Sequence, residues 1–189
     1  MIKEECKFAI KTLEWTRSDE PLIDEMVEMF EAQKRKIFDI TFWETGGNIR
    51  NFCSSCVIDD VVFAVKDKET NHLAAIFVLE NIRPYKNIII NANLHCVVNK
   101  PYWGKLSREL CLEFRDYLKY NYNINKLTAC VPQNGYGVIK LLKDIGFKHE
   151  ATCKKCLLYY DKNNKPKLYD DLVFTLQFME EIDKCLQEQ

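Results

Sequence analysis

The segment from residue 93 to residue 147 constrains the fold most, because a strand, a turn and a helix follow one another twice within it. The first strand ends at His95-Cys96-Val97-Val98, and the turn at residues 100–105 leads into a helix with apolar residues at every fourth position. The second strand, residues 127–131, leads into a helix that closes on Gly146-Phe147. Since a helix separates the two strands, we expect them to pair in parallel and not as a hairpin. A helix N-terminus directly after a strand also offers backbone N–H groups that can hold an anion.

Length and composition favour a single domain. The chain has 189 residues, of which 47% are hydrophobic, and this suits one globular core that buries most of the chain. We therefore expect one domain over residues 1–189. The net charge of −1 and the pI near 6.3 do not provide the basic field of a general nucleic-acid-binding protein, and Lys and Arg are scattered. No nucleic-acid partner is expected.

The N-terminal sequence and the cysteines bear on location. Residues 1–6 lack the apolar core of a signal peptide, and the longest apolar runs, residues 61–65 and 73–79, are too short to cross a bilayer. We expect a cytoplasmic protein with no membrane partner. The chain has nine cysteines, an odd number that cannot all form pairs. We therefore expect reduced and mostly buried thiols instead of a disulfide framework.

Hydrophobic periodicity and turn residues predict the remaining elements. Before residue 88 they are a strand (7–15), a helix (22–38) after a Ser-Asp-Glu-Pro cap, an irregular segment with a short helix (39–58), and a hairpin (61–66 with 73–80). A third strand (88–98) pairs antiparallel to the second. After residue 147 they are a strand (148–160), a polar turn (161–166), a last strand (172–178) and an acidic tail helix. This order is typical of a mixed α/β protein.

Three motifs resemble the GCN5-related N-acetyltransferase (GNAT) family. They are the run Val98-Asn99-Lys100-Pro101-Tyr102-Trp103-Gly104-Lys105, the strand-Asn-helix unit that ends in Gly146-Phe147 with Glu150, and the closing Leu168-Tyr169-Asp170-Asp171-Leu172-Val173-Phe174. The closing motif looks like the branch that acetylates protein N-termini, including those of ribosomal proteins, and like phage-encoded members. The resemblance covers the whole chain. It implies a single-domain α/β (α+β) GNAT-like fold, with a mixed, mostly antiparallel twisted sheet of six to seven strands and helices on both faces.

The same resemblance implies acetyl-CoA as co-substrate, an amine acceptor that is a small molecule or a protein, and a monomer or homodimer. It places the cofactor on Val97, Val98, Trp103, Gly104, Lys105, Leu106, Ser107, Arg108 and Asn134. For Asn134 an ordinary helix N-cap is the alternative. The loop departs from the family, whose phosphate-binding signature would fall on Trp103, Leu106 and Arg108. Lys100, Lys105 and Arg108 could supply charge to the phosphates instead, and a solvated basic turn is the alternative.

The chemistry of acetyl transfer indicates which side chains to seek. An amine is mostly protonated at neutral pH, so a base is useful, and the family commonly places one on the strand before the phosphate loop. His95 is the candidate base, with a structural histidine as the alternative. Asn93 shares its face and could orient a water or the acceptor, or it could form only a strand-edge hydrogen bond.

The acid that usually protonates the leaving thiolate is missing. The resemblance implies a Tyr at the position that Leu142 occupies, and Tyr136 is about 9 Å away along the same helix on another face. Either solvent protonates the thiolate, or the chain is a catalytically weak or inactive GNAT-fold protein of phage origin that binds or inhibits a partner. Fold alone does not decide between them.

For the acceptor, Trp43 and Glu44 offer an aromatic wall and a carboxylate that suit a cationic amine, although such residues often only pack or face solvent.

Two Cys-x-x-Cys pairs, Cys53 with Cys56 and Cys153 with Cys156, raise the alternatives of a zinc site or a redox pair. The pairs are far apart in sequence, and residues i and i+3 of a strand point to opposite faces unless a turn intervenes. We therefore expect no metal.

Overall fold

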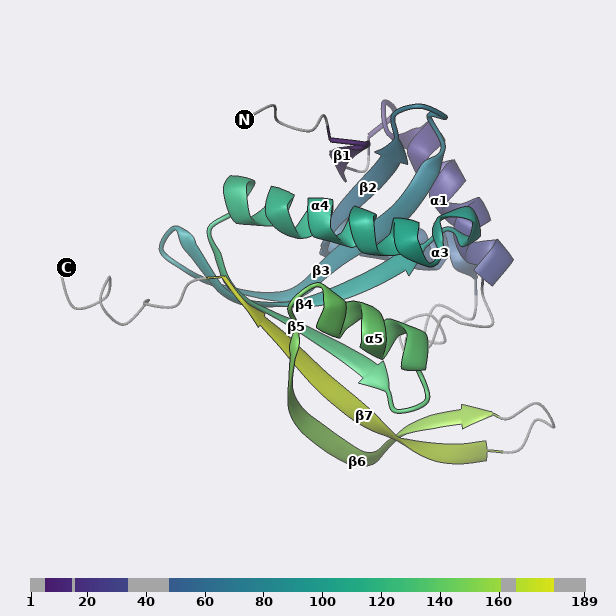
Figure 1. Cartoon of the computed structure of the whole chain (residues 1–189). Coiled ribbons are helices and arrows are strands. Elements are labelled where there is room, and N and C mark those ends of the chain that lie inside the picture. Colours follow the sequence, from purple (N-terminus) through teal and green to yellow (C-terminus); the bar gives the residue numbers. More distant parts are fainter. Residues whose placement is uncertain (1–5, 15, 34–47, 161–165, 179–189) are drawn as a thin grey trace. The chain divides into compact units, whose positions relative to one another are not determined.

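The computed structural model describes residues 6–14, 16–33, 48–160 and 166–178. In chain order the elements are β1 (Phe8–Leu13), α1 (Glu20–Gln33), α3 (Ile49–Asp59), β2 (Val61–Asp67), β3 (Leu73–Tyr85), β4 (Ile88–Val98), the 3-10 helix η2 (Lys100–Tyr102), α4 (Lys105–Asn121), β5 (Ile124–Pro132), α5 (Tyr136–Asp144), β6 (Lys148–Tyr160) and β7 (Pro166–Gln177). Figure 1 shows this succession along the chain.

The strands form a seven-stranded sheet with the hydrogen-bonded order β1-β2-β3-β4-β5-β7-β6. The pairs β1–β2, β2–β3, β5–β7 and β6–β7 are antiparallel, whereas β4 and β5 are parallel. The predicted mixed, mostly antiparallel sheet is thus confirmed. The parallel pair is also as expected, because the connection from β4 to β5 runs through a helix.

The chain divides into two compact units. Unit 1 comprises Met1–Glu80 and His95–Glu113, and unit 2 comprises Asn81–Leu94 and Phe114–Gln189. Each unit therefore contains one of the two strand-to-helix turns that the sequence predicts.

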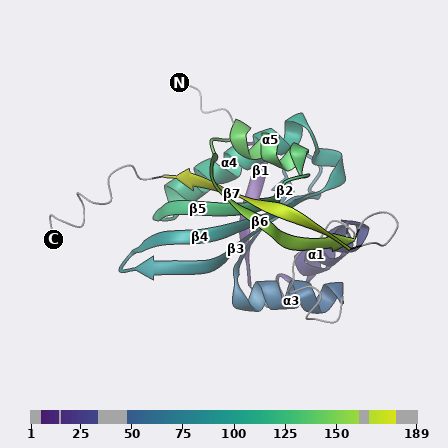
Figure 2. The same cartoon turned by 90° about the horizontal axis from the view of Figure 1, so that it is seen from below.

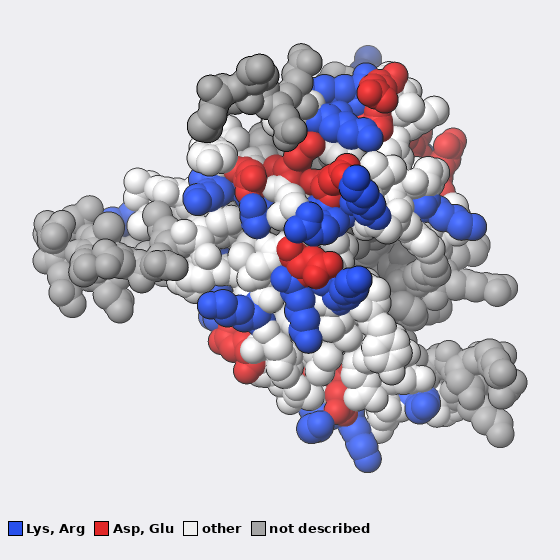
Figure 3. Space-filling view, in the orientation of Figure 1, with Lys and Arg blue, Asp and Glu red and all other residues white. Residues whose placement is uncertain are grey.

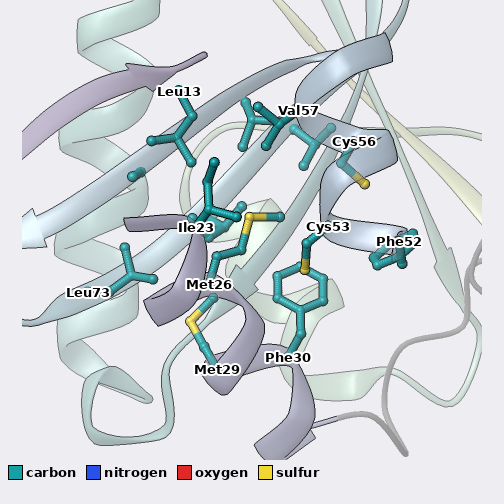
Figure 4. Packing of buried hydrophobic residues seen from close by; sticks show 14 of the residues in the cluster. Leu13, Ile23, Met26, Met29, Phe30, Phe52, Cys53, Cys56, Val57 and Leu73 are labelled. Carbon is teal, nitrogen blue, oxygen red and sulfur yellow. The ribbon is translucent and has the colours of Figure 1, made fainter. Parts of the chain in front are cut away.

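In unit 1, α1 and α3 cover one face of the strands β1, β2 and β3. Alternate strand residues, including Val62, Ala64, Ile76 and Val78, join Ile23, Met26, Met29 and Phe30 of α1 and Phe52, Cys53, Cys56 and Val57 of α3 in one apolar cluster, the α1/α3 cluster (Figure 4). Phe63 and Phe77, on the opposite face, are also fully buried. Figures 1 and 2 show the beginning of α4 on the side of these strands away from α1 and α3. Both faces of the unit 1 strands are therefore covered, in agreement with the continuous runs of buried residues in β2 and β3.

In unit 2, β5 and β7 support α5. Leu127, Ala129 and Val131 are buried at alternate positions of β5, and Leu142 of α5 is buried with Ile145 and Phe147 just after it. The parallel register between β4 and β5 runs from Ile89 with Ile124 to Asn93 with Thr128. α5 ends at Asp144, and Gly146, two residues later, has a φ of 103° that lets the chain reverse into β6.

Some boundaries differ from the sequence-based expectation. β7 begins at Pro166 and not at residue 172, because its early residues pair with the far half of β6, from Leu157 with Tyr169 to Tyr160 with Pro166. α1 is described up to Gln33, and the predicted continuation to residue 38, the turn at 161–165 and the acidic tail helix lie outside the described residues. The short helix expected between residues 39 and 58 is α3, which Asn48 caps by accepting a bond from Asn51 N at 3.0 Å. Within the described ranges, no helix is both long and apolar enough to span a membrane.

Candidate active site

The loop between β4 and α4 is fastened to its surroundings within unit 1. Asn99 N donates to Ala74 O at 2.8 Å, and the Asn99 side-chain Nδ2 donates to Leu73 O at 3.0 Å. Trp103 Nε1 donates to Val98 O at 2.9 Å. These bonds hold the two ends of η2, because Asn99 precedes it and Trp103 follows it.

The middle of the loop is anchored by Tyr102. Its side chain is buried, its hydroxyl lies 3.2 Å from Thr70 Oγ1, and its ring contacts the edge of Phe8 at a centroid distance of 6.3 Å. Trp103, the next residue, is 44% exposed. The loop therefore buries one aromatic residue as an anchor and presents the other to solvent.

Gly104 forms the turn into α4. Its φ is 82°, a region that L residues with a side chain rarely adopt, and a Cβ built there would meet nothing within 4 Å. Ser107 Oγ donates to Gly104 O at 2.7 Å and closes the first turn of the helix. Because first-turn N–H groups have no partner inside a helix, the backbone of Lys105 and Leu106 can bind an anion here. The residues predicted to bind the cofactor between positions 103 and 108 thus gather at one helix N-terminus.

Three basic side chains flank this turn. Lys100, Lys105 and Arg108 are exposed, and the Lys105 Nζ lies 3.6 Å from Glu109 Oε1. On the face shown in Figure 3, Lys and Arg side chains alternate with Asp and Glu among the described atoms. That face therefore carries no continuous stripe of positive charge among the described residues.

The end of β4 in unit 1 carries His95. Its Nε2 lies 3.0 Å from Glu80 Oε2 at the end of the buried part of β3. Val97, two residues farther along the same face of β4, packs against the α1/α3 cluster. The carbonyl of Val98 accepts a second bond from Gln33 Nε2 of α1 at 3.2 Å. The predicted base thus has a carboxylate partner, and the strand end is bonded on two sides.

Sequence reasoning missed Glu80 and Gln33. The position of a turn could have indicated Glu80. The turn between β3 and β4 lies at Lys86 and Asn87, and residues at equal distances before and after such a turn lie beside each other. This places Glu80 beside the segment from Asn93 to His95. Gln33 offered no such signal, since only the packing of α1 places its side chain at β4.

Two of the predicted residues belong to unit 2. Asn93 lies opposite Thr128 in the parallel register and is half-buried. Asn134 is exposed, and the N-cap of α5 is Gly135, without a side-chain hydrogen bond to the helix. The alternative interpretation of Asn134 as the helix N-cap is therefore wrong, whereas a role in cofactor binding stays a prediction.

Leu142 and Tyr136 both lie in α5 of unit 2. Leu142 is buried at 7% exposure within α5, and its carbonyl accepts a bond from Phe147 N at 2.9 Å. Tyr136 is 78% exposed at the first position of the same helix. Leu142 is therefore a core residue of unit 2, and no titratable group stands at that position.

The two residues predicted to recognise the acceptor, Trp43 and Glu44, lie outside the described residues.

The first Cys-x-x-Cys pair is part of the core of unit 1. Cys53 and Cys56 of α3 are 0% and 5% exposed and lie in the α1/α3 cluster (Figure 4). Burial raises the pKa of Cys53 to about 12, so the thiol stays neutral at physiological pH. This pair acts as small apolar side chains.

The second pair lies on a bulge of β6 in unit 2. The register with β7 shifts between Cys153 and Leu157, Lys155 has a φ of 48°, and Cys156 Sγ lies 3.3 Å from Cys153 O. Asp170 holds the bulge by accepting bonds from Lys155 N at 3.0 Å and Lys154 Nζ at 2.8 Å. The regular alternation of faces, from which these two cysteines were expected to point apart, is interrupted by this bulge. Across the described part of the chain, no group of three or more His, Cys, Asp or Glu side chains has the arrangement of a metal site.

The family model of the acetyltransferase (GNAT) domain matches residues 24–170. The chain therefore belongs to the GNAT family of acetyltransferases and is an acetyl-CoA-dependent acyltransferase. The comparison with curated protein sequences found no match.

Solved structures share the fold at low sequence identity. Spermidine N-acetyltransferase from Vibrio cholerae, in complex with CoA and spermine, has 17% identity and a TM-score of 0.66 over 92% of this chain and 96% of its own. The ribosomal-protein-S5-alanine acetyltransferase from Vibrio fischeri has 15% identity and a TM-score of 0.65 over 94% and 96%. The yncA protein of Salmonella typhimurium, solved with its cofactor acetyl-CoA, has 14% identity and a TM-score of 0.62 over 93% and 96%. At these identities the likeness concerns the fold.

Proposed function

We propose that this chain transfers the acetyl group of acetyl-CoA to the nitrogen of a primary amine by direct attack in a ternary complex. The observation that carries the proposal is the β4–α4 loop of unit 1. There the open turn at Gly104 and the first turn of a 17-residue helix directly follow the strand that bears His95. An anion site and a candidate base are thus supplied by one continuous strand-loop-helix segment.

The loop supplies the groups that would hold the co-substrate. The backbone N–H groups of residues 104–107 donate to its phosphates, while Trp103 contributes its side chain and Lys105 and Arg108 add positive charge. In the proposal, the backbone of Val97 and Val98 and the side chain of Asn134 contact the pantetheine arm, as the family resemblance implies. Bound acetyl-CoA supplies a thioester carbon that an amine can attack.

His95 acts as the base and takes a proton from the acceptor nitrogen, so that its lone pair can form the new C–N bond while the C–S bond breaks. Asn93 orients the acceptor or a water. A backbone N–H at Val97 or Val98 donates to the oxygen on which negative charge develops. Because Leu142 cannot supply a proton, solvent protonates the leaving thiolate.

The acceptor proposed is a protein N-terminus, a lysine or a small-molecule amine. The structurally similar proteins include a ribosomal-protein-S5-alanine acetyltransferase and a spermidine N-acetyltransferase, which supports both a protein and a polyamine as acceptor classes to test. In the proposal, Trp43 and Glu44 receive the acceptor amine, residues 1–189 work as one cytoplasmic domain, and that domain is a monomer or a homodimer.

Two measurements test the proposal in order. Acetyl-CoA should raise the melting temperature of the whole chain, because a ligand that binds only the folded state stabilises it. Release of CoA should then be measured against a panel of amines, peptides and ribosomal proteins. With an accepted amine, His95→Ala should lower kcat by about 100-fold, the range of a lost general base, and leave acetyl-CoA binding unchanged.

A second function, a binding or inhibitory protein with the acetyltransferase fold, is favoured by the buried Leu142 at the acid position. A thermal shift with acetyl-CoA but no turnover with any amine would support this function. No shift at millimolar acetyl-CoA would contradict the proposed binding of the co-substrate at the β4–α4 loop.

A further inference from the structure

We propose that Glu80 is a positioning residue for His95: its carboxylate fixes the imidazole and stabilises the charge that the ring gains on taking a proton. The observation is the 3.0 Å distance between Glu80 Oε2 and His95 Nε2. The inference rests on the proposed function, in which His95 is the base.

The strand pattern explains why these two side chains meet. Ile76 and Val78 of β3 belong to the α1/α3 cluster, and Glu80 is the next residue in the same alternating row. On β4, Val97 packs against that cluster and His95 is the neighbouring residue in its row. The pair therefore lies where the two apolar rows end, on the sheet face that α1 and α3 cover.

Burial distinguishes a functional pair from a stabilising one. The Glu80 side chain is 23% exposed and the His95 side chain 46%, so the apolar rows shield the carboxylate more than the imidazole. An ion pair this close to solvent contributes little to stability. Its effect is larger on a ring that alternates between neutral and charged forms, because a neighbouring carboxylate attracts only the charged form.

Other titratable groups on this face belong to α1 and α3. Asp24 is paired with Arg50 at 2.7 Å, Glu25 with Lys66 at 3.0 Å, and the Asp59 carboxylate accepts a bond from Ser55 Oγ at 3.0 Å. Cys53 and Cys56 lie within the cluster; burial raises the pKa of Cys53, and the smaller effects of Arg50 and Glu31 lower and raise it, respectively. Glu80 is the carboxylate in direct contact with the ring.

The test compares three variants in the whole chain: Glu80→Gln, His95→Gln and the double variant. The matched control is Glu25→Gln, which breaks an ion pair of the same length in the same unit. Glu80→Gln should lower kcat by about 10-fold, with the KM for acetyl-CoA unchanged. Without the Glu80 carboxylate the charged His95 ring is less stable and loses its proton at lower pH. The acid limb of the profile of kcat against pH should therefore move down by about half a pH unit to one pH unit. In the His95→Gln background the same change should have no further effect, and Glu25→Gln should match the wild type.

Three results would overturn the inference. An unmoved acid limb would reduce Glu80 to a structural residue. A loss that persists in the His95→Gln background would show that Glu80 acts independently of the ring. A raised KM for the amine with unchanged kcat would make Glu80 a binding site for the acceptor cation.

A readout that needs no turnover separates this inference from the proposed function. The His95 ring can be titrated by NMR in the wild type and in Glu80→Gln, and an unchanged midpoint would overturn the pairing even if no acceptor is found. Glu80→Asp, with a shorter side chain, provides a second variant if Glu80→Gln folds poorly. Failure of the proposed function would instead appear in the wild type, as no thermal shift and no release of CoA.

Discussion

The turn from β4 into α4 and the turn from β5 into α5 both carry a strand end into a helix N-terminus, but they are packed differently. The first contains the 3-10 helix η2 and ends at Gly104, around which a Cβ would meet nothing within 4 Å. The second ends at Gly135, where a Cβ would lie 2.8 Å from Val131 Cγ1 and 3.1 Å from Pro132 O. Gly104 is required by its positive φ, whereas Gly135 is required because neighbouring atoms leave no room for a Cβ.

The two turns differ in the room that they leave for a ligand. At Gly135 the chain's own atoms fill the inner side of the turn, and Gln133 N before it is bonded to Asp170 O at 2.9 Å. At Gly104 the loop is fastened from outside by Asn99 and Trp103, which leaves the helix N-terminus open. Of the two turns, the one at Gly104 therefore has the more open helix N-terminus, and this agrees with the proposed binding of acetyl-CoA there.

The largest expected effect is that of Gly135→Ala on stability. Its φ of −80° suits alanine, so the cost is steric, and the free energy of unfolding should fall by about 1–3 kcal/mol in a urea titration. In a Val131→Ala background the same substitution should cost less, because Cγ1 is gone. A loss below about 0.5 kcal/mol, the range of ordinary surface substitutions, would contradict the crowding.

Next in size is Gly104→Ala, for which the cost is conformational. A φ of 82° should cost alanine about 1–2 kcal/mol of stability, and acetyl-CoA affinity measured by calorimetry should fall with it. Gly104→Asn should cost less, because Asn tolerates positive φ better.

Gly137→Ala provides the matched control for Gly104→Ala. Gly137 lies within α5, has equally open surroundings and should gain about 0.5–1 kcal/mol from helix propensity. Equal effects of Gly104→Ala and Gly137→Ala would contradict the claim that the positive φ of Gly104 makes its substitution costly.

A smaller effect is expected for Trp103→Phe, which keeps an aromatic ring but removes the bond from Nε1 to Val98 O. Loss of that bond should reduce stability by about 1 kcal/mol and raise the Kd for acetyl-CoA several-fold as the loop loosens. An unchanged Kd would show that Asn99 and Tyr102 suffice to hold the loop.

The smallest effect is expected for Lys105→Ala. Because the Lys105 side chain is 89% exposed, its attraction to a phosphate is screened, and the Kd for acetyl-CoA should rise by only about two- to fivefold at low salt. The rise should shrink at high salt. Lys119→Ala, at the opposite end of α4, is the control and should leave the Kd unchanged.

The order and type of the elements could be predicted from the sequence, because each depends on a local period or a turn residue. The hairpin of β2 and β3, the strand β4 and the parallel pair β4–β5 all follow from such signals. The long pairing of β6 with β7 beyond the Cys153 bulge could not be predicted, because it depends on register between distant residues.

The candidate site, like the fold, could be predicted from the sequence only in part. Gly104 and the residues after it follow from the motif, and the structure gathers them at the start of α4. The environment of each Cys-x-x-Cys pair did not follow from spacing, since one lies in a buried helix and the other on an exposed bulge.

By itself, the sequence determined that a strand runs through His95 into a glycine turn and a helix, because those features need only neighbouring residues. The tertiary structure alone decided that Glu80 reaches His95, that Gly135 has no room for a side chain, and that Asn134 is not a helix cap. These outcomes depend on which atoms of separate strands come within a few ångströms, and hydrophobic periodicity does not encode that distance.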